Sequence, residues 1–284
     1  MAHAFRILNV FTVPGDRLSG NPLCVFEDAT GLSDESMQGL ARQLNLSETT
    51  FIAPGEEGVS ANVRIFTPNY EMPFAGHPTL GTAYVVREMS GGGDAVTLRL
   101  RAGDIPVRAS GNVWTLQANA PTSSPVEVAR QDLIRMIGLT GENGDCMAAE
   151  PLWVDTGTVQ LILPLQSARD VRTAAADPRL LADFAARQDG ESLVYLWAPT
   201  GADTIEARFF FTQNHTVIED PATGSACANL GGWFLANGER GIRRRIHQGS
   251  AIQRPSVLDL TVDDEGAIFV SGVVREVGRG TFTI

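Results

Sequence analysis

The sequence contains no lysine, and all 22 of its basic residues are arginine. A Schiff base to pyridoxal phosphate or to a ketone substrate requires a lysine amine, and a Walker-type phosphate loop requires its own lysine. The composition therefore excludes both mechanisms. Any amino-acid chemistry carried out by this protein has to proceed without pyridoxal phosphate.

Cysteine is also scarce, with only Cys24, Cys146 and Cys227 in the chain. They are far apart and form no C-x-x-C pair, so the sequence indicates neither a disulfide framework nor a zinc site. This usage is typical of a reducing compartment, and we expect a cytoplasmic protein. Residues 1–13 do not resemble a signal peptide, and no apolar run reaches the length of a membrane-spanning helix.

Positive charge is in the minority, because the formal net charge is −11 and the sequence pI is about 4.8. A nucleic-acid partner would require a basic face, so we expect none. The one basic cluster, Arg243 to Arg245, is flanked by Ile242 and Ile246. That pattern favours a strand with one solvated face over a binding patch.

The chain has 284 residues and 43% hydrophobic content, and this length favours two domains. Residues 120–125, APTSSP, give the clearest linker signal. We predict an N-terminal lobe of residues 1–119, joined by a last strand at about 279–284, and a C-terminal lobe of residues 120–278. Strands do not alternate strictly with helices, so we predict an α+β fold of two curved sheets rather than a doubly wound parallel sheet.

The segment from Arg64 to Met89 organises the first half. Alternation predicts a strand at residues 64–67, a loop follows, and Gly76-His77-Pro78 opens a helix. Pro78 fits the first helical position, where its missing N–H costs nothing. The free N–H groups and the positive end of such a helix suit a carboxylate or a phosphate.

The second half repeats this pattern. Residues 206–211 predict a strand, and the turn EDPATGSA (Glu219 to Ala226) leads into a helix of small and apolar residues. Gly76 and Gly224 hold the same place in the two segments. Two unrelated strand-turn-helix connections would look similar, but the two small-residue helices favour an internal repeat.

Four side chains in these segments are candidates for chemistry. Glu48 precedes Phe51 and Ile52, and a carboxyl group beside apolar walls can serve as a general acid or base. The alternative is an ordinary exposed acid in a turn, and this segment taken alone favours that alternative. His77 lies at a helix start, where a neutral imidazole is favoured, and it could also be a capping residue without a chemical role. Asp220 could pair with His77, bind a substrate amine or merely form an Asx turn.

Ser225 could bond a substrate oxygen or serve only the first helical turn. Together with Asp220 and His77 it invites comparison with a hydrolase. However, no glycine lies two residues before Ser225, so the segment is not a nucleophile elbow.

Four blocks of the sequence resemble the PhzF-like family, the phenazine-biosynthesis isomerases within the diaminopimelate-epimerase fold. They are SGNPLCVF (Ser19 to Phe26), LSETTFI (Leu46 to Ile52), RIFTP…PFAGHPTLGTA (Arg64 to Ala83) and EDPATGSA (Glu219 to Ala226). Gln248-Gly249 before Arg254 is similar as well. The blocks occur in the family order from the first strand to the last third of the chain.

The resemblance implies two pseudo-symmetric α/β lobes, each a sheet rolled around a central helix, with the site in the cleft between them. It also implies no cofactor, no metal and a homodimer that acts on a small carboxylate. The residues that it assigns to catalysis are Glu48, His77, Asp220 and Ser225. The residues that it assigns to substrate binding are Asn21, Gly76, Thr223 and Gly224.

Related diaminopimelate epimerases and proline racemases use two catalytic thiols in these turns, whereas this sequence has Ala75 and Thr223 there. The resemblance therefore favours isomerisation, with Glu48 moving one proton between carbons. The model reaction is the isomerisation of trans-2,3-dihydro-3-hydroxyanthranilate. An amino-acid racemase or epimerase, and a small-molecule binding protein on the same scaffold, are the alternatives.

Overall fold

The computed structural model describes residues 2–139, 146–187, 190–213 and 216–284. The chain divides into two compact units. Unit 1 comprises Met1–Gln117 and Ser271–Ile284, and unit 2 comprises Ala118–Val270.

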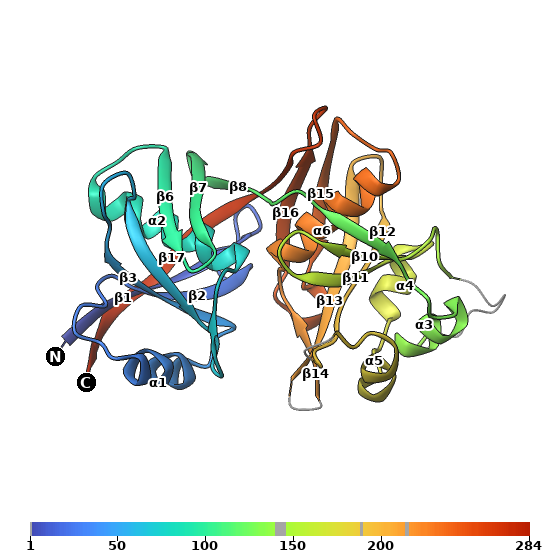
Figure 1. The fold of residues 1–284 in the computed structure, drawn as a ribbon, viewed down its shortest axis with the longest axis horizontal. Coiled ribbons are helices and arrows are strands. Elements are labelled where there is room, and N and C mark those ends of the chain that lie inside the picture. The colour runs from blue at the N-terminus through green and yellow to red at the C-terminus, as the bar shows by residue number, and fades with distance from the viewer. Residues whose placement is uncertain (1, 140–145, 188–189, 214–215) are drawn as a thin grey trace. The chain divides into compact units, whose positions relative to one another are not determined.

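Unit 1 is built from nine strands and two helices of the described residues (Figure 1). These elements are β1 (Ala2–Val10), β2 (Asn21–Phe26), α1 (Asp34–Leu44), β3 (Glu48–Pro54), β4 (Ala61–Phe66), β5 (Glu71–Met72), α2 (Gly76–Ser90), β6 (Ala95–Leu100), β7 (Gly103–Ser110), β8 (Val113–Gln117) and most of β17 (Ile268–Thr283).

The strands of unit 1 close into a ring. From β1 the pairing passes through β2, β3, β4, β6, β7 and β8 to β17, which pairs back with β1. The pairings β2–β3 and β4–β6 are parallel, and β5 adds a short antiparallel edge to β4. Helix α2 contacts six of these strands, so it is the central element of the unit.

The small residues of α2 explain how a helix fits inside the ring. Almost all of its residues from Gly76 to Val86 are buried, so the helix has no broad solvated face. At Gly81, an added Cβ would lie 2.5 Å from Cδ2 of Leu23 on β2. A larger side chain would therefore have to push a strand away from the helix.

Unit 2 contains the remaining elements. They are β9 (Thr122–Pro125), α3 (Arg130–Met136), β10 (Leu152–Asp155), β11 (Val159–Pro164), α4 (Ala168–Thr173), α5 (Pro178–Phe184), β12 (Leu193–Pro199), β13 (Thr204–Gln213), β14 (Thr216–Asp220), α6 (Gly224–Ala236), β15 (Ile242–Gln248), the 3₁₀ helix η1 (Ser250–Ile252) and β16 (Ser256–Val262). Helix α6 contacts β9, β10, β11 and β16.

The two units share one order of strand pairings. In unit 1, β1–β2 is antiparallel, β2–β3 parallel, β3–β4 and β4–β5 antiparallel, β4–β6 parallel and β6–β7 antiparallel. In unit 2 the same sequence of directions runs through β10–β11, β11–β12, β12–β13, β13–β14, β13–β15 and β15–β16. The internal repeat predicted from Gly76 and Gly224 therefore extends over the whole sheet of each unit.

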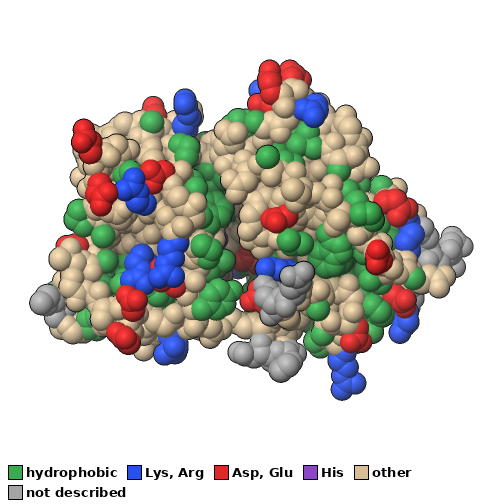
Figure 2. All heavy atoms as spheres, viewed as in Figure 1, with side chains coloured by type: hydrophobic (Ala, Val, Ile, Leu, Met, Phe, Trp, Pro, Cys, Tyr) green, Lys and Arg blue, Asp and Glu red, His purple; other side chains and the backbone are tan. Residues whose placement is uncertain are grey.

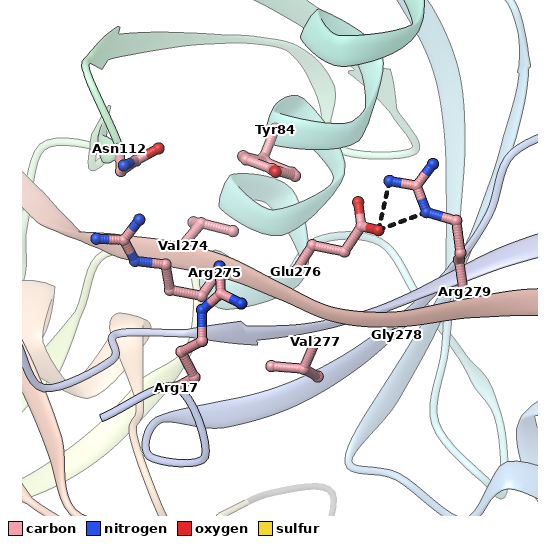
Figure 3. Close-up of a pocket in the computed structure, with 9 residues that line it drawn as sticks. All are labelled: Arg17, Tyr84, Asn112, Val274, Arg275, Glu276, Val277, Gly278 and Arg279. Carbon is pink, nitrogen blue, oxygen red and sulfur yellow. Dashed lines mark hydrogen bonds and ion pairs between the residues drawn. The ribbon is translucent and has the colours of Figure 1, made fainter. Parts of the chain in front are cut away.

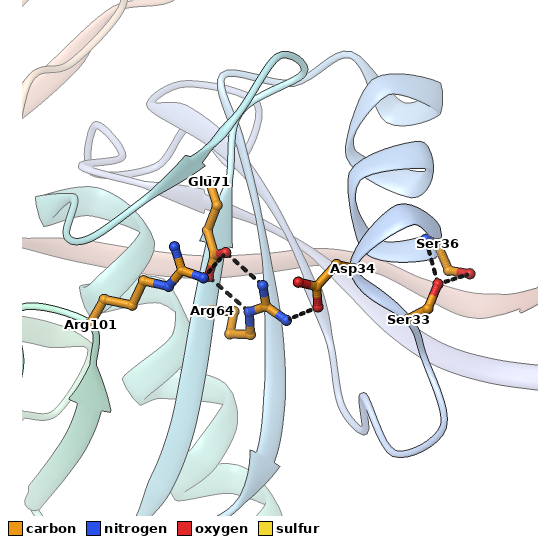
Figure 4. Close-up of polar contacts among 6 residues, drawn as sticks. All are labelled: Ser33, Asp34, Ser36, Arg64, Glu71 and Arg101. Atoms are coloured by element: carbon orange, nitrogen blue, oxygen red, sulfur yellow. Dashed lines mark hydrogen bonds and ion pairs between the residues drawn. The ribbon is translucent and has the colours of Figure 1, made fainter.

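The repeat also extends to side chains. In unit 1, Arg64 of β4 forms a two-point ion pair with Glu71 of β5, at 2.8 and 2.6 Å (Figure 4). In unit 2, Arg208 of β13 binds Glu219 of β14 in the same way, at 3.1 and 2.7 Å. Each arginine also lies over the ring of the phenylalanine two residues later. These pairs fasten the hairpin that leads to the central helix.

Three details differ from the sequence predictions. Helix α2 begins at Gly76, so Pro78 is its third residue, where the missing N–H is still harmless because the first N–H groups have no acceptor within the helix. Residues 122–125, predicted as linker, form β9 and pair with β10. The last strand, predicted at about 279–284, is part of the longer strand β17. Its residues 271–278, predicted for the C-terminal lobe, group with unit 1 because β1 and β8 hold them.

The surface agrees with the composition. Acidic and arginine side chains lie interspersed on the face shown in Figure 2. The arginine cluster belongs to β15, and Arg245 pairs with Asp259 of β16 at 2.9 Å, as predicted for a strand with a solvated face. Among the described residues, no helix is both long enough and apolar enough to span a membrane.

Candidate functional site

The eight predicted site residues fall into two clusters of four, one in each unit. The histidine cluster, in unit 1, consists of Asn21, Glu48, Gly76 and His77. The serine cluster, in unit 2, consists of Asp220, Thr223, Gly224 and Ser225. In both clusters the residues come from the ends of strands and from the first turn of the central helix.

Backbone pairing creates the histidine cluster. Glu48 is the first residue of β3, and the parallel pairing with β2 sets it opposite Leu23. Asn21 and Pro22 open β2, and His77 is the second residue of α2. As a result, Oε2 of Glu48 lies 3.3 Å from Nε2 of His77, and both side chains are largely buried.

His77 is held as the neutral imidazole. Burial lowers its pKa from 6.5 to about 3, against a smaller opposing effect of a backbone hydrogen bond with Pro22. Proline has no N–H, so this bond goes to the carbonyl of Pro22 and a ring nitrogen of His77 donates it. Since Nε2 faces Glu48, the donor is Nδ1. Nε2 therefore carries a lone pair.

This tautomer determines what the pair can do. A neutral imidazole whose Nδ1 carries the hydrogen can only accept at Nε2. A hydrogen bond between Nε2 and Oε2, which are 3.3 Å apart, therefore requires a proton on Glu48. A buried carboxyl group next to such an acceptor is a candidate general acid and base.

The serine cluster is organised by a glutamine. Thr223, the N-cap of α6, donates its hydroxyl to Oδ2 of Asp220, the last residue of β14. Nε2 of Gln248 on β15 donates to the carbonyl of Asp220 at 2.9 Å and to Oγ1 of Thr223 at 3.0 Å. Asp220 thus has a local side-chain partner three residues away.

A second glutamine contacts Ser225. Nε2 of Gln160, on β11, lies 3.0 Å from Oγ of Ser225, and Oε1 of Gln160 accepts from Asn229 at 2.8 Å. In the sequence, Gln248 stood out only within a motif, and Gln160 and Asn229 were missed. The available signals were the amide of Gln160 at the end of an apolar strand and the amide of Asn229 within an apolar helix. Neither signal identifies a site residue unless the fold is known.

The two central helices begin in the same way. Ala75 and Thr223 are the N-caps of α2 and α6, and in the described structure neither side chain caps its own helix. The backbone N–H groups of Gly76 and Gly224 therefore start their helices as donors with positive electrostatic potential. Such ends favour anions.

The thiols do not occupy these positions. Cys24 and Cys227 are fully buried, on β2 and within α6. Burial raises the pKa of Cys24 to about 12 and also raises the pKa of Cys227. Thiols that stay protonated at neutral pH are poor bases and poor nucleophiles.

A pocket of about 380 Å³ in unit 1 lies elsewhere (Figure 3). Its lining residues are Arg17, Tyr84, Asn112, Val274, Arg275, Glu276, Val277, Gly278 and Arg279. Within it Glu276 is paired with Arg279 at 2.6 Å. None of the predicted site residues lines this pocket.

The comparisons with known proteins agree with the fold and the motifs. The family model PhzC-PhzF, described as phenazine biosynthesis-like protein, matches residues 8–274. The chain belongs to this family. It is similar to a protein of Pasteurella multocida (strain Pm70) described as an uncharacterised isomerase, with 39% identity over 281 residues that cover 98% of this chain and 93% of that protein.

Two further similarities bear on class and fold. A trans-2,3-dihydro-3-hydroxyanthranilate isomerase of Pseudomonas aeruginosa is 33% identical over 282 residues, which cover 95% of each chain. The crystal structure of a PhzF-family phenazine biosynthesis protein of Bacillus anthracis matches with a TM-score of 0.86 at 22% identity over all of both chains. The predicted α+β fold and the predicted enzyme class are confirmed, and the protein is a PhzF-like isomerase.

Proposed function

We propose that this isomerase moves a proton between two carbons of a small carboxylate substrate, with Glu48 as the general acid and base. The observation that carries the proposal is the buried pair of Glu48 and a neutral His77, 3.3 Å apart. The P. aeruginosa relative is named for trans-2,3-dihydro-3-hydroxyanthranilate, and we propose the same compound as the model substrate.

The remaining residues bind and orient this substrate. We assign its carboxylate to a helix start, because the backbone N–H groups at Gly76 and at Gly224 favour anions. Ser225 contributes a hydroxyl to the same group, and Asn21 and Thr223 complete the binding residues. Asp220 fixes Thr223 and the turn before α6.

One proton on one carboxyl group suits isomerisation. Glu48 removes a proton from one carbon, which forms an enol-type or dienol-type anion, and then returns the proton to another carbon of the same substrate. No oxidant or reductant is consumed. We propose that Nε2 of His77, which lies 3.3 Å from Oε2 of Glu48, accepts a hydrogen bond from Glu48 when Glu48 carries the proton.

The substitution Glu48→Gln tests this role. It keeps the shape of the side chain but removes the transferable proton, so we expect turnover of trans-2,3-dihydro-3-hydroxyanthranilate to fall by about 100- to 10,000-fold. Deuterium uptake from D₂O at the product carbon should fall in parallel. Glu56→Gln is the matched control, because Glu56 is an exposed acid paired with Arg99.

The outcomes separate the alternatives. Full turnover and full deuterium uptake by Glu48→Gln would remove Glu48 from the mechanism. Deuterium at a stereocentre with inversion would instead indicate a racemase or epimerase, which needs a second base. Cys24 and Cys227 are buried and have raised pKa values, so the structure does not support a thiol pair for that role. A ligand bound without exchange at any carbon would indicate a binding protein.

Assembly and location complete the proposal. From the likeness to the family we infer a cytoplasmic homodimer that works without a cofactor. Light scattering would check the dimer against the chain mass of 30.4 kDa.

A further inference from the structure

A buried chain of hydrogen bonds leads to Ser225, and backbone groups fix its direction. The N–H of Thr156 and the hydroxyl of Thr156 lie 2.9 and 2.7 Å from Oδ1 of Asn229. A backbone N–H can only donate, so the atom of Asn229 that faces it is the carbonyl oxygen. The side-chain orientation of Asn229 follows from this one contact.

The orientation of Asn229 fixes the donor and the acceptor in each of the remaining hydrogen bonds that lead to Ser225. Nδ2 of Asn229 donates to the carbonyl of Thr158 at 2.8 Å, and a carbonyl can only accept. The carbonyl of Thr158 and the N–H of Thr156 therefore indicate the same orientation of the Asn229 amide. Nδ2 also donates to Oε1 of Gln160 at 2.8 Å, which leaves Nε2 of Gln160 to donate to Oγ of Ser225 at 3.0 Å. Gln160 and Asn229 are both buried, so water does not compete for these bonds.

We propose that Gln160 is a positioning residue that fixes the hydroxyl of Ser225 as a hydrogen-bond donor toward the substrate. Because Oγ accepts from Gln160, the hydroxyl hydrogen has to point away from Gln160. Ser225 then adds a side-chain donor to the N–H donors at the start of α6. The inference rests on the proposed function for the identity of the acceptor, a substrate carboxylate oxygen.

The histidine cluster uses the same device with the opposite result. His77 and Ser225 are each the second residue of their central helix, and β2 and β11 hold the same place in the two pairing orders. Pro22 of β2 accepts from His77 and so leaves an acceptor at Nε2. Gln160 of β11 donates to Ser225 and so leaves a donor. The repeat thus presents opposite hydrogen-bond polarity in its two halves.

The first experiment needs no substrate. In a ¹⁵N spectrum of the deuterated protein, the side-chain NH₂ pair of Gln160 is identified by its loss in Gln160→Met. In Ser225→Ala we expect one proton of that pair to shift upfield and to exchange faster with water, because its acceptor is gone. If both protons of Gln160 are unchanged in Ser225→Ala, then Gln160 does not donate to Ser225 and the proposal is overturned.

The second experiment measures kinetics with trans-2,3-dihydro-3-hydroxyanthranilate. In Gln160→Glu the ionised carboxylate accepts from Ser225 and turns its hydrogen away from the substrate. We expect KM to rise about 10- to 100-fold with little change in kcat, the loss of one hydrogen bond to a charged group. Gln160→Met only releases the hydroxyl, so its KM should rise less.

The control separates positioning from mere structural support. In a Ser225→Ala background, Gln160→Glu should change KM by less than about twofold, since the group through which it acts is absent. An equal rise in both backgrounds, or equal effects of Gln160→Glu and Gln160→Met, would overturn the proposal. If the parent protein does not turn over this compound, the proposed function fails while the ¹⁵N result still decides the direction of the Gln160–Ser225 bond.

Discussion

At the scale of single residues, the chemistry depends on which atom carries a hydrogen. His77 is neutral because it is buried, and the carbonyl of Pro22 selects its tautomer. In a similar way, the amide of Gln160 orients the hydroxyl group of Ser225. Neither selection uses a charged partner for the oriented side chain.

The burial of His77 predicts a pH dependence of stability. Its pKa is about 3 in the folded protein and 6.5 when unperturbed. Between these values the unfolded chain binds a proton that the folded chain does not, so its contribution is fully present above about pH 6.5 and is lost as the pH falls. We expect the free energy of unfolding to fall by about 1.4 kcal/mol per pH unit from this residue alone.

Urea unfolding at about pH 7 and about pH 5 checks this slope. The substitution His77→Asn should remove this pH dependence. The difference in the free energy of unfolding between the parent protein and the variant should therefore become smaller as the pH falls. His247→Asn, on the partly exposed face of β15, is the control and should leave the slope unchanged. If the difference in the free energy of unfolding between the parent protein and His77→Asn is the same at both pH values, then the pKa of His77 is not lowered in the folded protein.

At the scale of elements, each central helix is preceded by a hairpin fastened by an arginine–glutamate pair. Glu71 and Glu219 both lie five residues before the first glycine of the helix. In unit 2, Arg208 also donates to the carbonyls of Val171, Arg172 and Ala174 at the end of α4. The pair therefore joins three elements of unit 2.

Arg208→Met should be strongly destabilising. Only 12% of the Arg208 side chain and 6% of the Glu219 side chain are exposed, so the variant would leave a buried carboxylate without its cation. We expect a loss of about 3 to 5 kcal/mol in the free energy of unfolding, measured by urea titration. Arg99→Met is the matched control, because its pairs with Glu56 and Asp104 are largely exposed and should matter little. Equal effects of the two substitutions would contradict this account.

At the scale of the whole molecule, the chain forms two units of like topology that share one strand. β17 begins with residues of unit 2 and then closes the ring of unit 1 against β1 and β8. At Gly272, an added Cβ would lie 2.2 Å from Cδ1 of Phe11, whose ring is fully buried. The closure therefore depends on a position without a side chain.

Gly272→Ala should loosen unit 1. We expect the free energy of unfolding to fall by about 1 to 3 kcal/mol, the usual cost of overpacking. Hydrogen exchange read by mass spectrometry should show faster exchange in peptides of residues 2–117, with little change in the described parts of 118–270. Gly278→Ala, on the same strand with nothing within 4 Å, is the control. A uniform increase across both units would instead mean that they open together.

Much of this could be predicted from local patterns. Strand alternation and glycine placement gave the two strand-turn-helix segments, and the motif blocks gave the family and the fold. The continuous β17 and the strand β9 were missed. Exposed residues such as those of 122–125 form a strand only because β10 provides a partner, and no local pattern encodes that partner.

The sequence by itself determined the excluded chemistry, the repeat and the residue types available to the site. Because the chain lacks lysine, its composition alone rules out Schiff-base mechanisms. Only the tertiary structure decided that Glu48 meets His77 and that Gln160 meets Ser225, through pairings between strands distant in the sequence. The physical reason is that hydrogen-bond direction depends on the partner, and the partner of each buried polar group is chosen by the fold.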